Sequence, residues 1–309
     1  MSRASNETLR DRARMLGVSR AFFAERGVLE VDCPFLARTA PVDPYIDIFE
    51  VLLGEGETGY LHSSPEYGMK RLLVRGIGPI YQLSHVYRKG ERGKRHQPEF
   101  TMVEWYRPDS SFGTFVEEIV AYLSLFFGAL PYEMTTYKQA FMRYAEIDPF
   151  RASRDLLEER LRHFRVETDV SEREALEGLL WGCAVEPRLG REGLMIVTDY
   201  PEEQAALAKT YVNEEGDKVA ERFEVYLNGT ELGNGYHELT DPAEQERRLR
   251  VANEKRRLIG KGVLPIDTLF LEALREGMPD AYGIAVGFDR LMMLRRGVDE
   301  IASVIPIAF

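Results

Sequence analysis

The amino-acid sequence predicts an α+β fold, with a mainly antiparallel sheet flanked by helices. Strand-like runs in the first third of the chain follow one another with few helices between them, which is typical of an antiparallel meander. They lie at roughly 46–53, 79–87 and 100–106. A later segment, "ERFEVYLNGTELGNGYHEL", carries Asn228-Gly229 between two alternating runs, a strong hairpin signal. Between these β regions, residues 110–220 are mostly helical in pattern, with one strand expected at "LMIVTDYP".

Helix signals bracket the first of these strands. Residues 6–26 have apolar side chains near helical spacing, with Ser5 or Asn6 as a possible N-cap and Gly27 as a terminating glycine. The segment "SPEYGMKRLLV" predicts a second helix, with Ser64 as the N-cap, Pro65 at the first helical position and Glu66 in the first turn. Both helices are therefore expected to pack beside the sheet.

Composition narrows the class of protein. The chain has 309 residues and a net charge of −11, which opposes non-specific attraction to nucleic acid. Its two cysteines, Cys33 and Cys183, lie far apart and lack the spacing of a zinc site or a disulfide framework. No run approaches the roughly 18 apolar residues that a membrane span requires. We expect a cytoplasmic protein with no membrane partner.

The hairpin segment carries two carboxylates. If Asn228-Gly229 forms the turn, position 226 faces 231 and position 224 faces 233. Glu224 and Glu231 then lie on one face, close enough to share a cation. The alternative is that both are solvated surface residues, but the apolar neighbours Phe223, Val225 and Leu232 weaken it. The pattern favours a metal site.

Two further segments suggest a site for an anion. The stretch 87–107 concentrates basic side chains in a chain that is otherwise acidic. Near the C-terminus, "AYGIAVGFDRLMMLRRG" runs a strand into a helix and places Arg290 at the junction. A buried arginine there is costly unless it faces an anion or a carboxylate, so a structural salt bridge is an equal alternative. Gly287 would let a ligand approach the backbone closely.

Taken in order, "GVLEVDCPFL", "YRKGERGKRHQPEF" and "GIAVGFDRLMM" resemble motifs 1, 2 and 3 of the class II aminoacyl-tRNA synthetases. The segments "SSPEYGMKRLL", "RHQPEFTMVEWY" and "FEVYLNGTELGNGYHELTD" are similar to the lysyl subtype, and the resemblance extends from about residue 8 over nearly the whole chain. It implies one catalytic domain over 1–309 with a helical insertion at roughly 110–220. It also implies a homodimer formed through motif 1, and no anticodon-binding domain is expected.

The resemblance implies that ATP and Mg²⁺ are cofactors. Arg88 would hold the α-phosphate and the substrate carboxylate, Arg290 the γ-phosphate and His96 the outer phosphates, while Phe100 would stack on adenine. Glu231, with Glu224, would hold Mg²⁺. The remaining nucleotide contacts would come from Glu91, Gln97, Leu232 and Gly287. Motif 2 usually has Glu where this chain has Gly90, so either Glu91 makes the adenine contact through a shifted loop or the backbone makes it.

The resemblance also assigns a lysine pocket. Ser64 and Glu66 would lie by the substrate amino group near the reacting end, whereas Glu104, Tyr106 and Glu238 would surround the distal ammonium. Asn234 and Ala285 would complete the pocket. Ala285 stands where lysyl enzymes have glycine, and it could either favour the β-amino isomer or simply be a small core residue. This number of acids suits a dicationic substrate.

The short form of the chain and the wording "TMVEWYRP" and "AERFEVYLNG" resemble synthetase paralogues that modify elongation factor P. The implied activity is ATP-dependent activation of a lysine isomer, (R)-β-lysine, and its transfer to a lysine side chain of elongation factor P, without stable tRNA binding. One alternative is a free-standing lysyl transferase that acts on tRNA or another acceptor. A second alternative is an inactive paralogue with a regulatory binding role.

Overall fold

The computed structural model describes residues 4–170 and 172–308. The chain divides into two compact units, which we call the first unit (Met1–Gly128 with His237–Phe309) and the second unit (Ala129–Tyr236). The single domain expected over 1–309 stays a prediction. None of the helices in the described part of the chain is long and apolar enough to cross a membrane.

The first unit is built on a sheet with strand order β1-β5-β6-β14, in which β5–β6 and β6–β14 are antiparallel and β1–β5 is parallel. A smaller antiparallel sheet has the order β2-β4-β3. The strands are β1 (Leu29–Glu30), β2 (Leu36–Ala37), β3 (Phe49–Gly54), β4 (Glu57–Leu61), β5 (Ile80–Tyr87), β6 (Glu99–Pro108) and β14 (Ala281–Gly287). The helices are α1 (Asn6–Glu25), α2 (Glu66–Val74), α3 (Phe112–Phe127), α7 (Pro242–Leu258), α8 (Thr268–Gly277) and α9 (Phe288–Arg296).

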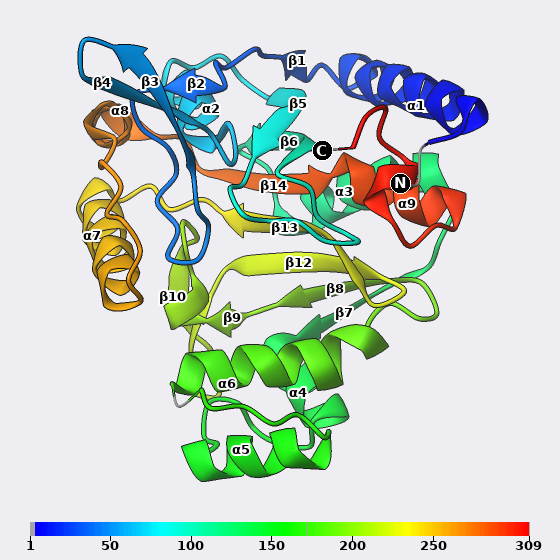
Figure 1. The fold of residues 1–309 in the computed structure, drawn as a ribbon, viewed down its shortest axis with the longest axis vertical. Helices are drawn as coiled ribbons and strands as arrows, with labels where there is room; N and C mark the ends of the chain where they lie inside the picture. The colour runs from blue at the N-terminus through cyan, green and yellow to red at the C-terminus, as the bar shows by residue number, and fades with distance from the viewer. Residues whose placement is uncertain (1–3, 171, 309) are drawn as a thin grey trace. The chain divides into compact units, whose positions relative to one another are not determined.

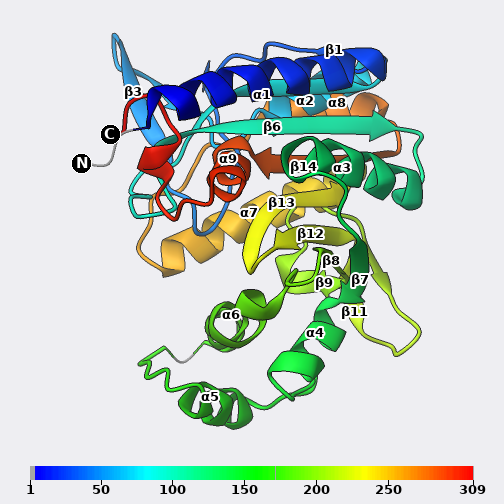
Figure 2. The same cartoon turned by 90° about the vertical axis from the view of Figure 1, so that its right-hand side faces the viewer.

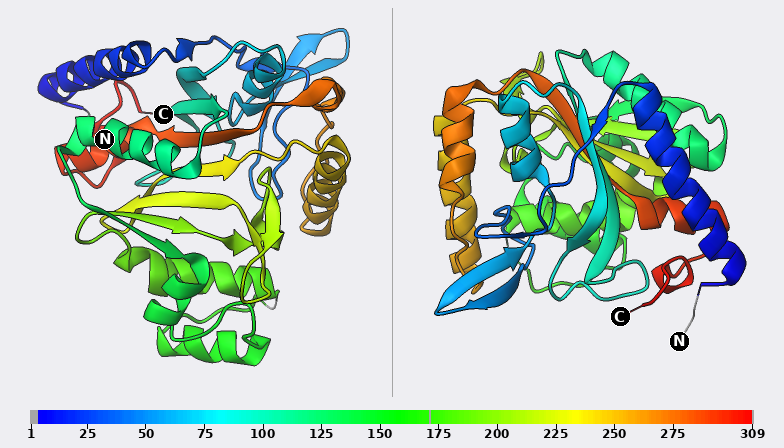
Figure 3. Two further views of the ribbon diagram at one scale, coloured as in Figure 1. Left: turned by 180° about the vertical axis from the view of Figure 1, so that it is seen from behind. Right: turned by 90° about the horizontal axis from the view of Figure 1, so that it is seen from above.

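Helices cover both faces of the first unit's larger sheet. Figure 2 shows α1 running along β6, and the right-hand view of Figure 3 shows α1 on one side of β5 and β6 with α2 and α8 on the other. On the α1 face, Trp105 packs against the rings of Phe23, Phe115 and Tyr122, at centroid distances of 5.3, 6.0 and 5.4 Å. Because side chains alternate along a strand, the neighbouring residues of β6 point to the face that α2 covers.

The second unit has the strand order β13-β12-β8-β7, with β7–β8 parallel and the other pairs antiparallel. A small sheet of order β10-β11-β9 adjoins it in this unit. The strands are β7 (Tyr132–Thr136), β8 (Leu194–Thr198), β9 (Tyr200–Pro201), β10 (Thr210–Val212), β11 (Lys218–Ala220), β12 (Arg222–Leu227) and β13 (Thr230–His237). The helices are α4 (Tyr137–Tyr144), α5 (Arg154–His163) and α6 (Arg173–Leu180), and Figure 1 shows them on one side of β7, β8 and β12.

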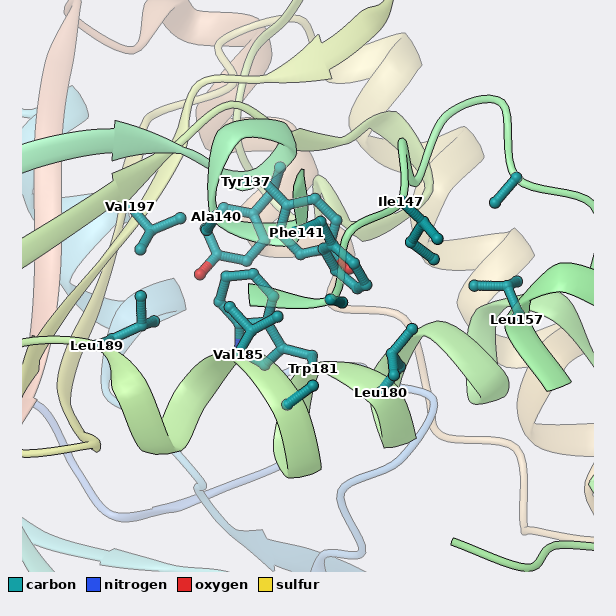
Figure 4. Close-up of a cluster of buried hydrophobic side chains, with 14 of the residues drawn as sticks. Tyr137, Ala140, Phe141, Ile147, Leu157, Leu180, Trp181, Val185, Leu189 and Val197 are labelled. Carbon is teal, nitrogen blue, oxygen red and sulfur yellow. The ribbon is translucent and has the colours of Figure 1, made fainter. Parts of the chain in front are cut away.

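An apolar core lies between these helices and the strands. In Figure 4, Tyr137 and Phe141 of α4 meet Trp181, Leu189 and Val197. The Tyr137 and Trp181 rings are stacked, with centroids 4.7 Å apart. This core gives the second unit its own apolar interior.

The local expectations are largely confirmed. The Ser5 hydroxyl caps α1 by accepting from the Thr8 N–H at 3.1 Å, and Gly27 has a φ of +66° just after the helix. One helix start differs from the expectation. The helix expected to begin at Pro65 begins at Glu66 with Pro65 as its N-cap, although the Ser64 hydroxyl still accepts from the Glu66 N–H at 3.0 Å.

The middle of the chain is also less helical than expected. Besides the predicted strand, which appears as β8 and β9, it contains β7, β10 and β11. These strands pair with partners distant in sequence, such as Tyr132 of β7 with Leu194 of β8. Short edge strands carry weak periodicity, so their formation depends on partners that local pattern does not reveal.

Candidate active site

The face of β6 and β14 that α2 covers carries three of the lysine-pocket residues expected from the sequence. Glu104 pairs directly with Ala285, and Tyr106 with Gly283. Directly paired residues share a face of the sheet, as do residues two apart on one strand. Glu104, Tyr106 and Ala285 are therefore neighbours in the first unit.

Hydrogen bonds hold the Glu104 carboxylate in place. Its Oε2 accepts from the Ser64 hydroxyl at 2.7 Å, and its Oε1 accepts from the Tyr106 hydroxyl at 2.6 Å. Glu104 is only 2% exposed. Burial raises the pKa of Glu104, and the nearby charge of Glu66 raises it further. Such a carboxyl stays ionised at neutral pH most readily when a cation is beside it.

A residue that the sequence reading missed lies in this pocket. The Lys70 Nζ contacts Glu66 Oε1 at 2.6 Å and Glu238 Oε2 at 2.5 Å, with the Lys70 side chain fully buried. Burial alone would lower the pKa of Lys70, but the charges of Glu238 and Glu66 outweigh it and raise the pKa. The i,i+4 spacing of Glu66 and Lys70 on a short helix was the available sequence signal.

The cluster of Glu66, Glu104 and Glu238 around Lys70, here called the acid cluster, has three carboxyl groups and one ammonium. Burial raises the pKa of Glu238; Lys70 opposes this rise and Glu66 adds to it. Since Lys70 neutralises only part of the negative charge, a cationic ligand would relieve the repulsion among the carboxylates. The acid cluster is chemically suited to an amine substrate.

Because Gly283 has no side chain, Glu238 and Tyr106 lie directly against the backbone of β14. A Cβ at this position would lie 2.4 Å from Glu238 Oε1 and 2.4 Å from Tyr106 Cε1. No side chain fits there while those two groups keep their places. Gly283 therefore determines how closely Glu238 and Tyr106 approach the strand.

The first part of the basic segment, residues 88–98, forms the loop between β5 and β6, and two of the expected nucleotide residues lie at its start and on β6 just beyond it. The Arg88 guanidinium lies 5.1 Å from the centre of the Phe100 ring. Arg88 Nη1 is 3.8 Å from Glu91 Oε1. Gly90 has a φ of +82°, a conformation that disfavours glutamate, which is a physical reason for glycine at this position. Whether Glu91 contacts adenine stays a prediction.

The first turn of α9 meets this loop. Arg290 Nη2 lies 3.1 Å from His96 Nε2. Desolvation and the charge of Arg290 lower the pKa of His96. Gln97 follows as a buried residue, and Gly287 immediately precedes α9. The first unit thus brings Arg88, Phe100, His96 and Arg290 to one loop and the helix beside it.

In the second unit, the Asn228-Gly229 hairpin is confirmed. Leu227 pairs with Thr230, and both turn residues have positive φ angles of 53° and 69°. Tyr226 faces Glu231 as expected, but Glu224 faces Asn234 and not position 233. Leu232 is the cause, because it is an extra residue in β13 that shifts the register beyond the turn.

Glu224 is not a solvated carboxylate, since it is 6% exposed. Its Oε2 accepts from the hydroxyls of Tyr200 at 2.6 Å and Tyr226, and its Oε1 accepts from Arg222 Nη2 at 2.5 Å. The Tyr226 hydroxyl bonds Glu224, and Tyr226 pairs directly with Glu231 across the hairpin. Burial raises the pKa of Tyr226, and the charges of both carboxylates raise it further.

Asn234 joins this network from β13. Its Oδ1 accepts from Arg222 Nε at 3.2 Å, and its Nδ2 donates to the Tyr236 hydroxyl at 3.2 Å. Glu224 and Glu231 lie on one face of the hairpin, and carboxylate oxygens are donors that Mg²⁺ takes together with phosphate. Among the described residues, no group of three or more acidic, histidine or cysteine side chains gathers to hold a metal, so the Mg²⁺ role of this pair stays a prediction.

The first unit therefore combines Arg88 and Arg290 near the β5–β6 loop with a pocket of carboxyl groups that suits a cation. The sequence matches the family "tRNA synthetases class II (D, K and N)" over residues 1–308, and the chain belongs to that family.

Individual relatives of this chain have names that state an activity more closely than the family does. The chain is 42% identical over 314 residues to a protein from Salmonella arizonae named "Elongation factor P--(R)-beta-lysine ligase". Proteins of the same name from Salmonella typhi and Enterobacter sp. are also 42% identical, over 310 residues each. In all three comparisons the match covers 98% of this chain and 95% of the relative.

Proposed function

We propose that this chain uses ATP to activate (R)-β-lysine as an acyl adenylate and transfers the acyl group to a lysine side chain of elongation factor P. The observation that carries the proposal is the acid cluster, in which the buried Glu104 and Glu238 and the partly buried Glu66 gather around one ammonium. The name of the relatives supplies the particular substrate and acceptor.

In the activation step, the substrate carboxylate attacks the α-phosphorus of ATP and pyrophosphate leaves. Negative charge gathers on the phosphoryl oxygens, so cations stabilise the reaction most where they face those oxygens. Arg88 holds the α-phosphate and the attacking carboxylate through its planar fork of donors. Arg290 and His96 bind the outer phosphates, and Phe100 stacks on the adenine.

The substrate amines bind to the acid cluster and its neighbours. Glu104, Tyr106 and Glu238 surround the distal ammonium, and Lys70 orients the carboxyl groups of Glu66 and Glu238 through its ion pairs with both. Ser64 and Glu66 lie by the amino group near the reacting end. Because the hydrogen bonds of Glu104 are already made, the carboxylate is held in place before the substrate arrives.

Glu224 and Glu231 would hold Mg²⁺, which would supply positive charge to the phosphate oxygens. Arg222, Tyr200 and Tyr226 fix the Glu224 carboxylate, so that its orientation does not depend on the ion. Asn234, hydrogen-bonded to Arg222, contributes to substrate binding from the same strand as Glu231.

In the transfer step, the deprotonated ε-amine of the acceptor lysine attacks the acyl carbonyl. An amide bond forms, the bond from acyl carbon to phosphate oxygen breaks, and AMP leaves. With a net charge of −11, the chain is not expected to bind tRNA stably. We place the enzyme in the cytoplasm and propose a homodimer, since the small sheet exposes Leu36, Leu52 and Leu53.

The test is ATP–pyrophosphate exchange with α-lysine and each β-lysine isomer, followed by mass spectrometry of elongation factor P and of tRNA incubated with the reaction. We expect exchange with a lysine isomer and a mass gain of one acyl group on elongation factor P only. Charged tRNA would favour the free-standing transferase. No exchange with any isomer would favour the inactive regulatory paralogue.

A further inference from the structure

Three segments that are distant in sequence meet at one buried ion pair in the first unit. Arg12 of α1 donates from Nη1 to Asp289 Oδ1 at 2.5 Å and from Nη2 to the Thr101 hydroxyl at 2.7 Å. The second oxygen of Asp289 accepts from the Thr101 backbone N–H at 2.7 Å. The side chains of Arg12 and Asp289 are 7% and 2% exposed. Arg12 also donates to the Val304 carbonyl at 3.3 Å.

This cluster stands directly beside two residues of the nucleotide site. Thr101 follows Phe100 on β6, and Asp289 precedes Arg290 in the first turn of α9. Gly287, the N-cap of α9, has no side chain that could cap the helix. Asp289 ties the start of this helix to β6 by accepting from the Thr101 N–H.

Stability alone is a weak reason for such a pair. A buried ion pair frequently adds little stability compared with apolar residues of similar volume. The pair instead fixes the orientation of the start of α9. A planar guanidinium that bonds both Asp289 and Thr101 permits little rotation of this helix start. The Arg290 side chain projects from that same turn and reaches His96.

We propose that Arg12 is a positioning residue: by holding Asp289 against Thr101, it fixes the first turn of α9 and so directs Arg290 to the phosphates of ATP. Arg12 itself touches no substrate. The inference rests on the proposed role of Arg290 in ATP binding.

Arg12→Lys tests this with the charge retained. A lysine carries its donors on one nitrogen at the end of a flexible stem, so it can stay opposite Asp289 but does not reproduce the rigid fork that holds Asp289 and Thr101 together. We expect the KM for ATP in pyrophosphate exchange to rise about tenfold, because small misplacements of a charged group weaken its action strongly. The KM for the lysine isomer should stay within about twofold.

The chain offers a matched control between the same two helices. Arg295 of α9 pairs with Asp11 of α1 at 2.8 Å and donates to the Phe126 carbonyl at 2.7 Å, without contacting Asp289. Arg295→Lys should leave the KM for ATP within about twofold of the parent, even if both variants lose similar thermal stability. An equal rise in both variants would reduce Arg12 to a structural role.

A second variant keeps the inference testable if Arg12→Lys does not fold. Thr101→Val preserves the backbone bond to Asp289 but removes the hydroxyl that Arg12 uses, and it should raise the KM for ATP about threefold. Calorimetric titration of ATP without lysine gives a readout independent of the lysine substrate. An unchanged ATP Kd in Arg12→Lys overturns the inference, whereas an absence of lysine-dependent exchange in the parent overturns the proposed function.

Discussion

Replacing Gly283 with alanine should disable the lysine pocket while leaving the fold intact. The new Cβ would lie 2.4 Å from both Glu238 Oε1 and Tyr106 Cε1, whereas ordinary van der Waals contact begins at 3.4 Å. Glu238, Tyr106 or the strand must therefore move by about 1 Å, a displacement that can reduce catalysis about 100-fold. Overpacking of this kind typically costs about 1–3 kcal/mol of folding free energy.

The assay is lysine-dependent pyrophosphate exchange together with thermal unfolding. We expect kcat/KM for the lysine isomer to fall about 100-fold, with the KM for ATP nearly unchanged, because Gly283 lies in the amine pocket. Gly113→Ala is the control, since a Cβ there meets no atom within 4 Å. If Gly283→Ala kept kcat/KM within about threefold of the parent, Glu238 and Tyr106 would not be the groups that bind the distal ammonium.

Three other substitutions test separate parts of the site. Lys70→Met should lower the free energy of unfolding by about 3–5 kcal/mol near neutral pH, because it leaves buried carboxylates without their cation. The pKa values of Glu104 and Glu238 are raised in the folded protein, so both groups ionise at lower pH in the unfolded chain. The stability lost on replacing Lys70 should therefore be larger at pH 8, where the carboxyl groups tend to ionise, than at pH 5. Arg290→Ala should reduce adenylate formation about 100- to 1,000-fold with the fold retained, because it removes a charge aimed at the reacting phosphates. Ala285→Gly should increase the use of α-lysine relative to (R)-β-lysine by roughly 10- to 200-fold, because it removes a methyl that would crowd the α-amine.

Each of these predictions has a result that contradicts it. If urea unfolding showed Lys70→Met to be as stable as the parent at pH 8, the carboxyl groups of the acid cluster would not need Lys70 as their cation. Exchange activity of Arg290→Ala within a few-fold of the parent would remove Arg290 from the nucleotide site. Equal ratios of kcat/KM for the two isomers in Ala285→Gly and the parent would leave Ala285 as a small residue on a strand.

Local chemistry determined much of this molecule. The cap of α1 at Ser5, the left-handed Gly27 and the Asn228-Gly229 turn depend on residues within a few positions of one another, so they can be predicted from the sequence. The strands on either side of the basic loop could also be predicted from the sequence, because residues that alternate along a strand face different environments. The resemblance to class II synthetases then gave the residues of the candidate site their expected roles.

Contacts between distant segments decided the rest. No role was expected for Lys70 from the sequence, and its burial follows only once Glu238 comes within 2.5 Å of it. The bulge at Leu232 shifted the register of Glu224 because packing beyond the turn overrides the register that the turn sets. Arg12 meets Asp289 across 277 positions of sequence. Charges are placed inside a protein by partners that only the folded chain brings near, since a buried charge is stable only when it is paired.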